Sequence, residues 1–199
     1  MMKPPVVGIL VGGANRRMGC PKALIQVEGL TLLERTVNVA RSVTDDVILL
    51  GLPPFDIPVT LSSLSVLEDR HFGIGPMGGL DSLLTARPSD SCILLACDMP
   101  YLDGRLMRRL VEAEGGFEAV ICTTPLAAGN ATKWHPCCGL YLPPVRARIQ
   151  EAIRNKRFGL TRLLDRMCVA PIALVGDEVR WVENWNTPDE VTGSMDLGT

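Results

Sequence analysis

Short runs of apolar residues alternate with segments of helical periodicity along the first half of the chain. Residues 6–10 and 47–50 are uninterrupted apolar runs, and such runs are typical of strands buried on both faces of a parallel sheet. Between them, residues 31–41 place apolar side chains at helical spacing, and Thr31 followed by Glu34 fits a capping box at the start of a helix. This pattern predicts a βαβ unit with a right-handed crossover.

The alternation continues along the chain without an internal repeat or a linker. Residues 91–97 form the most convincing central strand, because five apolar or small side chains follow one another there. We therefore expect one α/β domain over residues 1–199, built on a mostly parallel sheet. The remaining predicted elements are strands at residues 65–67, 118–123, 138–142 and 169–175, and helices at 79–86, 102–114, 145–154, 160–166 and from 187 onward.

The composition narrows the class of protein. With 47% hydrophobic and 21% charged residues, the chain is globular, and a formal net charge of -2 argues against a nucleic-acid partner. Seven cysteines without a Cys-x-x-Cys pair predict reduced thiols rather than disulfides or a zinc site. No apolar run approaches the roughly 20 residues that span a bilayer, and the first residues lack a signal core. We expect a cytoplasmic protein with no membrane partner.

The loop after the first predicted strand contains a glycine pair and three cations within seven residues. Open α/β sheets bind ligands at the carboxyl ends of their strands, where this loop must lie. Gly12 and Gly13 would leave backbone amides close to phosphate oxygens, and Arg16, Arg17 and Lys22 would repel one another unless an anion lies among them. A di- or triphosphate fits best, and a glycine-rich turn with exposed basic residues is the alternative. The loop reads Leu10-Val-Gly-Gly-Ala-Asn-Arg-Arg-Met-Gly-Cys-Pro-Lys22.

Asp98 follows the predicted central strand directly. A carboxylate at this end of a strand faces the same crevice as the first loop. Magnesium prefers carboxylate and phosphate oxygens and takes only one or two protein ligands, so Asp98 is the candidate metal ligand. The alternative is an aspartate that caps a turn or a helix.

The first loop resembles the signature Leu-x-Gly-Gly-x-x-x-Arg-Met-Gly-x-x-Lys of the molybdenum-cofactor guanylyltransferases, the MobA-type proteins. Cys97-Asp-Met-Pro100 resembles the Asp-x-Pro metal motif of the same family. The resemblance implies a Rossmann-like three-layer α/β/α nucleotidyltransferase domain. It further implies that Lys22, Arg17 and Asp98 are catalytic and that Asp98 holds Mg²⁺.

Two later segments resemble the same family. Residues 68–79 resemble Asp-x-x-x-Gly-x-Gly-Pro-Leu-x-Gly, which makes Asp69 a candidate for nucleotide or substrate contact, and residues 182–189 resemble Asn-x-Asn-Thr-Pro-x-Glu. An ordinary helix start is the alternative for the last segment. The residues that the resemblance assigns to nucleotide, metal or pterin binding are Leu10, Gly12, Gly13, Arg16, Lys22, Asp69, Asp98, Asn184 and Asn186.

The activity implied by the resemblance is Mg²⁺-dependent transfer of GMP from GTP to molybdopterin, with release of pyrophosphate. Transient contact with other molybdenum-cofactor biosynthesis proteins or apo-molybdoenzymes is implied as well. Pro21 stands where many guanylyltransferases have aspartate and cytidylyl- and sugar-nucleotide enzymes have proline, so CTP transfer to the pterin and nucleotidyl transfer to a sugar or polyol phosphate remain alternatives. A non-catalytic nucleotide-binding module is another.

Two further patterns have other interpretations. Residues 73–78 satisfy Gly-x-Gly-x-x-Gly, but the charged residues before them do not form the buried strand that a dinucleotide fingerprint requires, and Pro76 removes an amide from the turn. Lys156, Arg157 and Arg162 form either a basic patch, for the pterin phosphate or a partner enzyme, or a solvated helix face.

Overall fold

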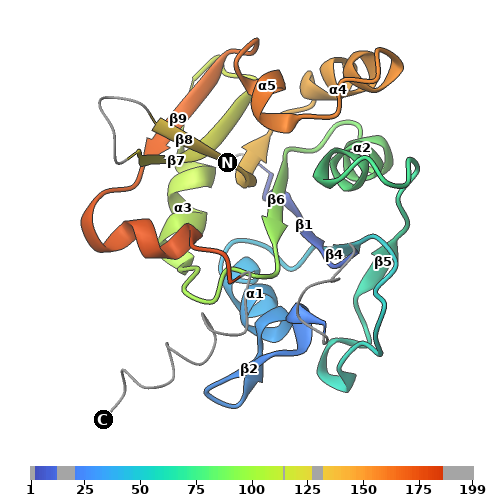
Figure 1. Ribbon diagram of the computed structural model, residues 1–199, viewed down its shortest axis with the longest axis vertical. Coiled ribbons are helices and arrows are strands. Elements are labelled where there is room, and N and C mark those ends of the chain that lie inside the picture. Colours follow the sequence, from blue (N-terminus) through green and yellow to red (C-terminus); the bar gives the residue numbers. More distant parts are fainter. Residues whose placement is uncertain (1–2, 13–20, 114, 127–131, 186–199) are drawn as a thin grey trace.

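The computed structural model describes residues 3–12, 21–113, 115–126 and 132–185. A seven-stranded sheet with the order β5-β4-β1-β6-β8-β7-β9 runs through it, and β8 alone is antiparallel to its neighbours (Figure 1). The mostly parallel sheet is as predicted. The strands are β1 (Val6–Leu10), β4 (Val47–Leu50), β5 (Ser65–Leu67), β6 (Cys92–Ala96), β7 (Ala119–Pro125), β8 (Thr132–Tyr141) and β9 (Val169–Ala173).

Helices cover both faces of this sheet, as a three-layer α/β/α fold requires (Figure 1). The described part of the chain also holds a small antiparallel pair of β2 (Gln26–Val27) and β3 (Leu30–Thr31) and three 3₁₀ turns. The helices are α1 (Leu32–Ala40), α2 (Pro76–Ala86), α3 (Gly104–Glu112), α4 (Val145–Arg154) and α5 (Leu160–Leu164), and the turns are η1 (Lys22–Leu24), η2 (Val59–Leu61) and η3 (Gly176–Val182).

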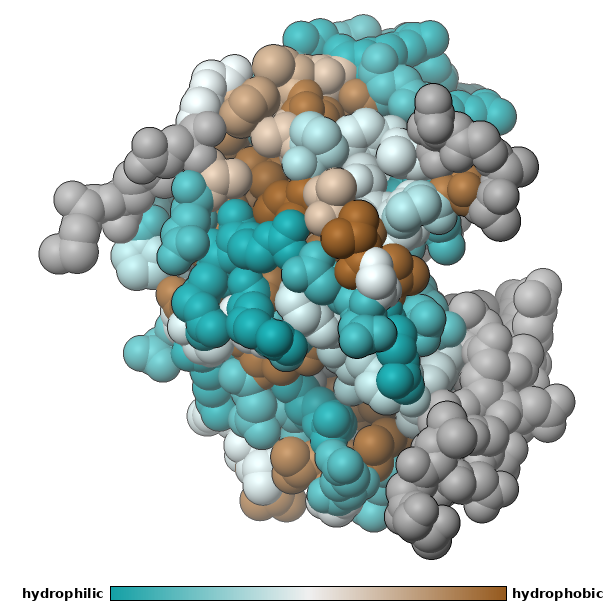
Figure 2. All heavy atoms as spheres, turned by 90° about the vertical axis from the view of Figure 1, so that its left-hand side faces the viewer, coloured by the Kyte–Doolittle hydropathy of each residue, from teal (hydrophilic) through white to brown (hydrophobic). Residues whose placement is uncertain are grey.

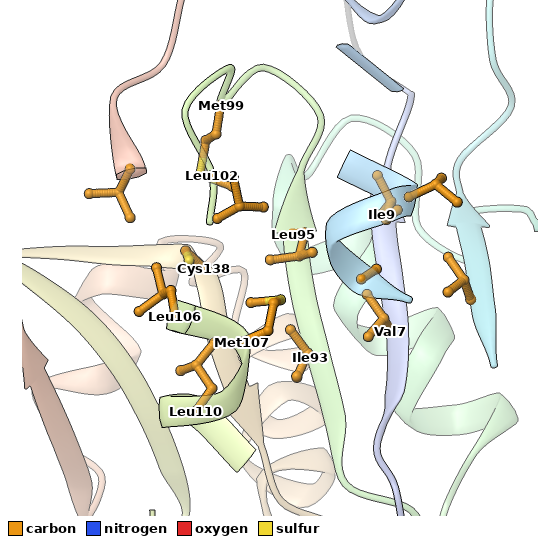
Figure 3. Close-up of a cluster of buried hydrophobic side chains, with 14 of the residues drawn as sticks. Val7, Ile9, Ile93, Leu95, Met99, Leu102, Leu106, Met107, Leu110 and Cys138 are labelled. Atoms are coloured by element: carbon orange, nitrogen blue, oxygen red, sulfur yellow. The ribbon is translucent and has the colours of Figure 1, made fainter. Parts of the chain in front are cut away.

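Two hydrophobic clusters lie on the two faces of the sheet, because successive strand residues point to opposite faces. In β1, Val7 and Ile9 pack in the cluster under α1 and α3, whereas Val6 packs in the cluster under α2, α4 and α5. Figure 3 shows the first cluster, in which side chains of α3 approach those of β6, and Val7 and Ile9 of β1 lie on the other side of β6, beside α1. Cys137 and Cys138 divide in the same way between the two clusters, so their side chains point to opposite faces of the sheet.

The elements of the first half form for the local reasons that the sequence predicts. Thr31 accepts a hydrogen bond from the N–H of Glu34 at 3.1 Å, and the Glu34 carboxylate accepts one from the N–H of Thr31 at 2.9 Å. Both halves of the capping box are therefore present at the start of α1. The helix predicted at residues 79–86 begins earlier, at Pro76, because Gly75 takes a φ of 68° before it and proline suits the first helical position.

The second half differs more from the prediction. β8 begins at Thr132 instead of residue 138, because its first half is paired with β7 through polar residues that carry no apolar pattern. The helix predicted from residue 187 lies outside the described residues. In the described part of the chain, no helix combines the length and the apolar character that crossing a membrane requires.

The order of the strands reverses beside β1. From β1 the chain continues through α1 to β4 and β5 on one side, and β6 then pairs with β1 on its other side. The carboxyl ends of β1 and β6 therefore flank the switch point of the sheet, where open α/β sheets form their binding crevice. Leu10 is in register with Ala96, so the residues after each strand leave the sheet side by side.

Candidate active site

A cavity of about 150 Å³ lies at this switch point. It is bounded by the last residue of β1 and the loop after it, by the start of η1, and by the end of β6 with the two residues that follow. Four of its lining residues are predicted site residues: Leu10, Gly12, Lys22 and Asp98. The complete lining is Leu10, Val11, Gly12, Lys22, Ala23, Ala96, Cys97 and Asp98.

Lys22 and Asp98 form an ion pair inside this cavity. The Nζ atom of Lys22 donates to Oδ2 of Asp98 at 3.2 Å, and the two side chains are only 17% and 18% exposed. The other carboxylate oxygen, Oδ1 of Asp98, is buried and accepts no hydrogen bond from the described residues. Because a buried carboxylate oxygen without a donor is costly, this atom is suited to a cation or to a hydrogen-bond donor of a ligand.

Two residues that follow Lys22 hold its main chain in place. Ala23 is 2% exposed and packs in the cluster under α1, and the N–H of Ile25 donates to the carbonyl of Lys22 at 3.0 Å to close the η1 turn. The apolar neighbour is thus buried in the core, whereas Lys22 itself lines the cavity.

Gly12 has a different role from the predicted one. Its N–H donates to the carbonyl of Leu50, the last residue of β4, at 3.2 Å. We expected this amide to bind a phosphate oxygen, but in the structure it is already hydrogen-bonded. A methyl group on Gly12 would lie 3.2 Å from Cα of Gly51, which itself has a φ of +84°. Glycine is required here because two backbones approach closely at the ends of β1 and β4.

Asp69 lies beside the same glycine contact. Its Oδ2 atom is 3.7 Å from the position of a methyl group on Gly51, and its Oδ1 atom is 3.6 Å from that of a methyl group on Gly79 in α2. Oδ1 is buried without a hydrogen-bond partner among the described residues, and burial raises the pKa of the carboxyl group. The structure thus brings Asp69 next to the Gly12 end of the cavity. Oδ1 of Asp69, like Oδ1 of Asp98, can therefore accept a bond from a ligand or a cation.

The segment near the end of the chain returns to Asp98. The N–H of Trp185 donates to the carbonyl of Asp98 at 2.9 Å, and the Trp185 ring, 5% exposed, lies edge-on to Tyr101 with 6.0 Å between the centroids. Asn184, which is exposed, therefore lies one residue from the main chain that carries Asp98. Trp185 anchors this segment, and the resemblance did not point to it.

Four predicted site residues lie outside the described residues: Gly13, Arg16, Arg17 and Asn186. Their roles remain predictions. The described residues include no group of three or more His, Cys, Asp or Glu side chains that could hold a metal ion. A magnesium ion here would therefore depend on one or two carboxylates and on ligand oxygens, which is how magnesium is usually held.

Two cysteines beside Asp98 were not predicted as part of the site. Burial, with a contribution from the charge of Asp98, raises the pKa of Cys97 and of Cys137 to about 12. Both are therefore neutral thiols at physiological pH, and neither is a thiolate nucleophile. Neither cysteine carries a charge, and the charge of Asp98 is balanced by Lys22.

An open α/β sheet with a cavity at its switch point is the arrangement found in nucleotide-binding α/β proteins. Residues 7–171 match the family model of the MobA-like NTP transferase domain, and the chain belongs to this nucleotidyltransferase family. The resemblance drawn from the sequence is thereby confirmed.

Relatives of similar length are known. The chain is 31% identical over 189 residues to a protein of Synechococcus elongatus named probable molybdenum cofactor guanylyltransferase, with 92% of this chain and 93% of the relative covered. It is 28% identical over 190 residues to a Bacillus cytotoxicus protein of the same name, with 92% of each covered.

Solved structures confirm the predicted fold. Molybdopterin-guanine dinucleotide biosynthesis protein A from Archaeoglobus fulgidus superposes with a TM-score of 0.73 at 22% identity, covering 96% of this chain and 97% of its own. The 2-C-methyl-D-erythritol 4-phosphate cytidylyltransferase from Thermus thermophilus superposes with a TM-score of 0.69 at 20% identity, covering 97% and 98%. At these identities the likeness concerns the fold alone.

Proposed function

We propose that this protein transfers GMP from GTP to molybdopterin and releases pyrophosphate, with Mg²⁺ as its metal. The Lys22–Asp98 pair in the switch-point cavity is the observation that carries the proposal. The names of relatives that align over 92% of the chain support the substrates. Molybdopterin and GTP would be soluble substrates of a cytoplasmic enzyme. This enzyme would contact other molybdenum-cofactor biosynthesis proteins or apo-molybdoenzymes transiently.

The residues present fit a magnesium ion. Oδ1 of Asp98 and Oδ1 of Asp69 are buried carboxylate oxygens without donors among the described residues, and a hard cation would satisfy such atoms. Asp98 would hold the ion, because it lines the cavity and its Oδ1 atom accepts no hydrogen bond from the described residues. When bound, the ion would neutralise phosphate charge and bring the reacting phosphates together.

In the proposed reaction an oxygen of the molybdopterin phosphate attacks the α-phosphorus of GTP. A new P–O bond forms, the bond between the α- and β-phosphates breaks, and pyrophosphate leaves with the electron pair. The protein needs no nucleophile, since positioning and charge neutralisation accelerate such transfers. Lys22 would turn from Asp98 to the phosphates, and Arg17 would add a second positive charge.

Pyrophosphate release tests the proposal directly. Purified protein is given Mg²⁺, molybdopterin and each of GTP, CTP, ATP and UTP in turn, and GTP is expected to support turnover. Asp98→Asn should lower the rate about a hundredfold or more, whereas Asp56→Asn, an exposed aspartate in the loop after β4, should leave it unchanged. Full turnover by Asp98→Asn would refute the assignment of the site.

Pro21 before Lys22 supports a second candidate within the same chemistry. Turnover with CTP instead of GTP would assign the protein as a molybdopterin cytidylyltransferase and leave the roles of Lys22 and Asp98 intact. Turnover only with a sugar or polyol phosphate as acceptor would change the second substrate. Nucleotide binding without turnover on any acceptor would make the protein a binding module.

A further inference from the structure

A second pocket lies between α4 and α5. It is larger than the switch-point cavity of Lys22 and Asp98, which we call the nucleotide cavity after the proposed function. The volume of the second pocket is about 320 Å³, which is at the lower end of the range for sites that bind small organic molecules. We call it the α4–α5 pocket. Half of its ten lining residues are cationic, on a chain with a net charge of -2. These cations are Arg148, Lys156, Arg157, Arg162 and Arg166.

Acidic partners offset only part of this charge. Nε of Arg148 lies 3.0 Å from Oε1 of Glu118, and Arg157 lies 3.5 Å from Glu151, the one acid in the lining. The other three cations, Lys156, Arg162 and Arg166, form no ion pair with any residue of the described chain. Cations gathered in one concave site repel one another, and an anion among them removes this repulsion.

The backbone at Lys156 gives a second, independent reason. The end of α4 is a Schellman turn, in which the N–H of Lys156 donates to Ile153 and the N–H of Arg157 donates to Ala152, both at 2.9 Å. Lys156 has a φ of 53° in this turn, a left-handed conformation that glycine adopts without strain. Glycine would be more stable at this position, yet the position carries a cation that lines the pocket.

The lining of the pocket also contains apolar side chains. These are Phe158, which is 39% exposed, Ala152 and Leu163. A flat ring can lie against an exposed aromatic side chain, while arginine and lysine bind phosphate oxygens. Cations and an aromatic ring in one lining thus suit a molecule with both a phosphate and a ring better than they suit a bare inorganic ion.

The α4–α5 pocket is separate from the nucleotide cavity. Figure 1 places α4 and α5 at the end of the molecule opposite to the carboxyl ends of β1 and β6. In the side view of Figure 2, hydrophilic residues form the upper rim of the molecule, at the height where Figure 1 shows these two helices. A ligand held by Lys22 and Asp98 would therefore leave this pocket open.

We propose that the α4–α5 pocket is a second ligand site, which binds the phosphate ester of a small ring-containing molecule. Arg162, Arg166 and Lys156 bind the phosphate oxygens, and Phe158 contacts the ring. The proposal does not depend on the reaction at the nucleotide cavity, since none of these residues lines that cavity.

Calorimetric titration with 4-methylumbelliferyl phosphate tests the proposal. The full chain is used with Lys22→Ala in every variant, which removes the contribution of the nucleotide cavity. We expect saturable binding of the ester, and at least about tenfold weaker binding both of 4-methylumbelliferone, which lacks the phosphate, and of inorganic phosphate, which lacks the ring. Absence of binding at millimolar ester would overturn the proposal, as would equal binding of the phosphate-free compound or of inorganic phosphate.

Matched variants locate the site. Arg162→Gln combined with Arg166→Gln should weaken binding about tenfold or more, whereas Arg154→Gln, an exposed arginine of α4 outside the lining, should leave it unchanged. Lys156→Gly should weaken binding and at the same time raise the unfolding midpoint by about 2–4 °C, because glycine relieves the left-handed turn. Equal weakening by Arg154→Gln would show general charge attraction and refute the site, and so would unchanged binding in Lys156→Gly and the double variant.

Discussion

Replacing Gly51 by alanine tests whether the contact between the ends of β1 and β4 shapes the nucleotide cavity. Gly51 has a φ of +84°, and a methyl group on it would lie 3.0 Å from Cα and 3.2 Å from N of Gly12. Both neighbours are backbone atoms, which cannot turn aside as a flexible side chain can. Gly29 has nearly the same φ, +82°, but a methyl group there would meet nothing within 4 Å.

The two glycines separate two contributions to the free energy of unfolding. Alanine in a left-handed conformation costs about 1–2 kcal/mol, and Gly29→Ala should lose only this amount. Gly51→Ala adds a steric conflict between two packed backbones, for which overpacking costs about 1–3 kcal/mol. The expected loss for Gly51→Ala is therefore about 2–5 kcal/mol.

Urea unfolding measures both losses on the same scale. Since Gly12 lines the nucleotide cavity, Gly51→Ala should also reduce the thermal stabilisation that GTP and Mg²⁺ give to the folded protein, while Gly29→Ala should preserve it. Equal losses of stability in the two variants would refute the steric argument. Undiminished nucleotide binding in folded Gly51→Ala would refute the claim that this contact positions the first loop.

Three other changes test separate parts of the structure. Burial and nearby Lys133 lower the pKa of His135 from 6.5 to about 4, so the unfolded chain takes up this proton at a higher pH than the folded protein does. The free energy of unfolding should therefore fall by about 1–2 kcal/mol as the pH is lowered from 6.5 to 4, after allowance for partial exposure. In His135→Gln, urea unfolding should show a smaller fall over the same pH range. Trp185→Ala should lower the free energy of unfolding by about 3 kcal/mol because the ring is 5% exposed, and calorimetry that shows no change would contradict the anchoring role. In a Cys20→Ser protein at pH 8, iodoacetamide should label Cys168 first, because it is the exposed one among the described cysteines; mass spectrometry that finds Cys97 labelled as fast would contradict its buried, protonated state.

The first half of the fold could be predicted because its signals are local. Strands such as β1 and β4 are buried on both faces and read as apolar runs, and α1 has both bonds of its capping box. Asp98 and Lys22 could be placed at one edge of the sheet for the same reason. Asp98 comes two residues after the end of β6, and Lys22 follows β1 in the first loop. Each of the two residues could thus be assigned to this edge from its own neighbourhood in the sequence, although their contact depends on the pairing of β1 with β6.

The first half of β8 could not be predicted because it is exposed or only partly buried, and it is a strand through its pairing with β7. Register passes from Ile121 opposite Gly139 to Cys122 opposite His135, so residues 136–138 bulge out of the ladder with β7, while Cys138 stays opposite Leu95 of β6. Pro136, which argues against a strand in sequence, lies in this bulge where no ladder N–H is needed. The Tyr141 hydroxyl donates to the carbonyl of Pro136 at 2.6 Å and closes the bulge. None of these contacts is visible in the apolar pattern.

The same register that builds the core also builds the site. Ile9 lies opposite Leu95 and Leu10 opposite Ala96, and this pairing brings Lys22 and Asp98, 76 residues apart, to within 3.2 Å. A slip of one residue between β1 and β6 would turn Ile9 and Leu95 to opposite faces of the sheet, and it would move the start of the first loop away from Asp98. The hydrophobic core therefore selects the register in which the Lys22–Asp98 pair forms, and substitutions that loosen the β1–β6 pairing should impair nucleotide binding before they unfold the protein.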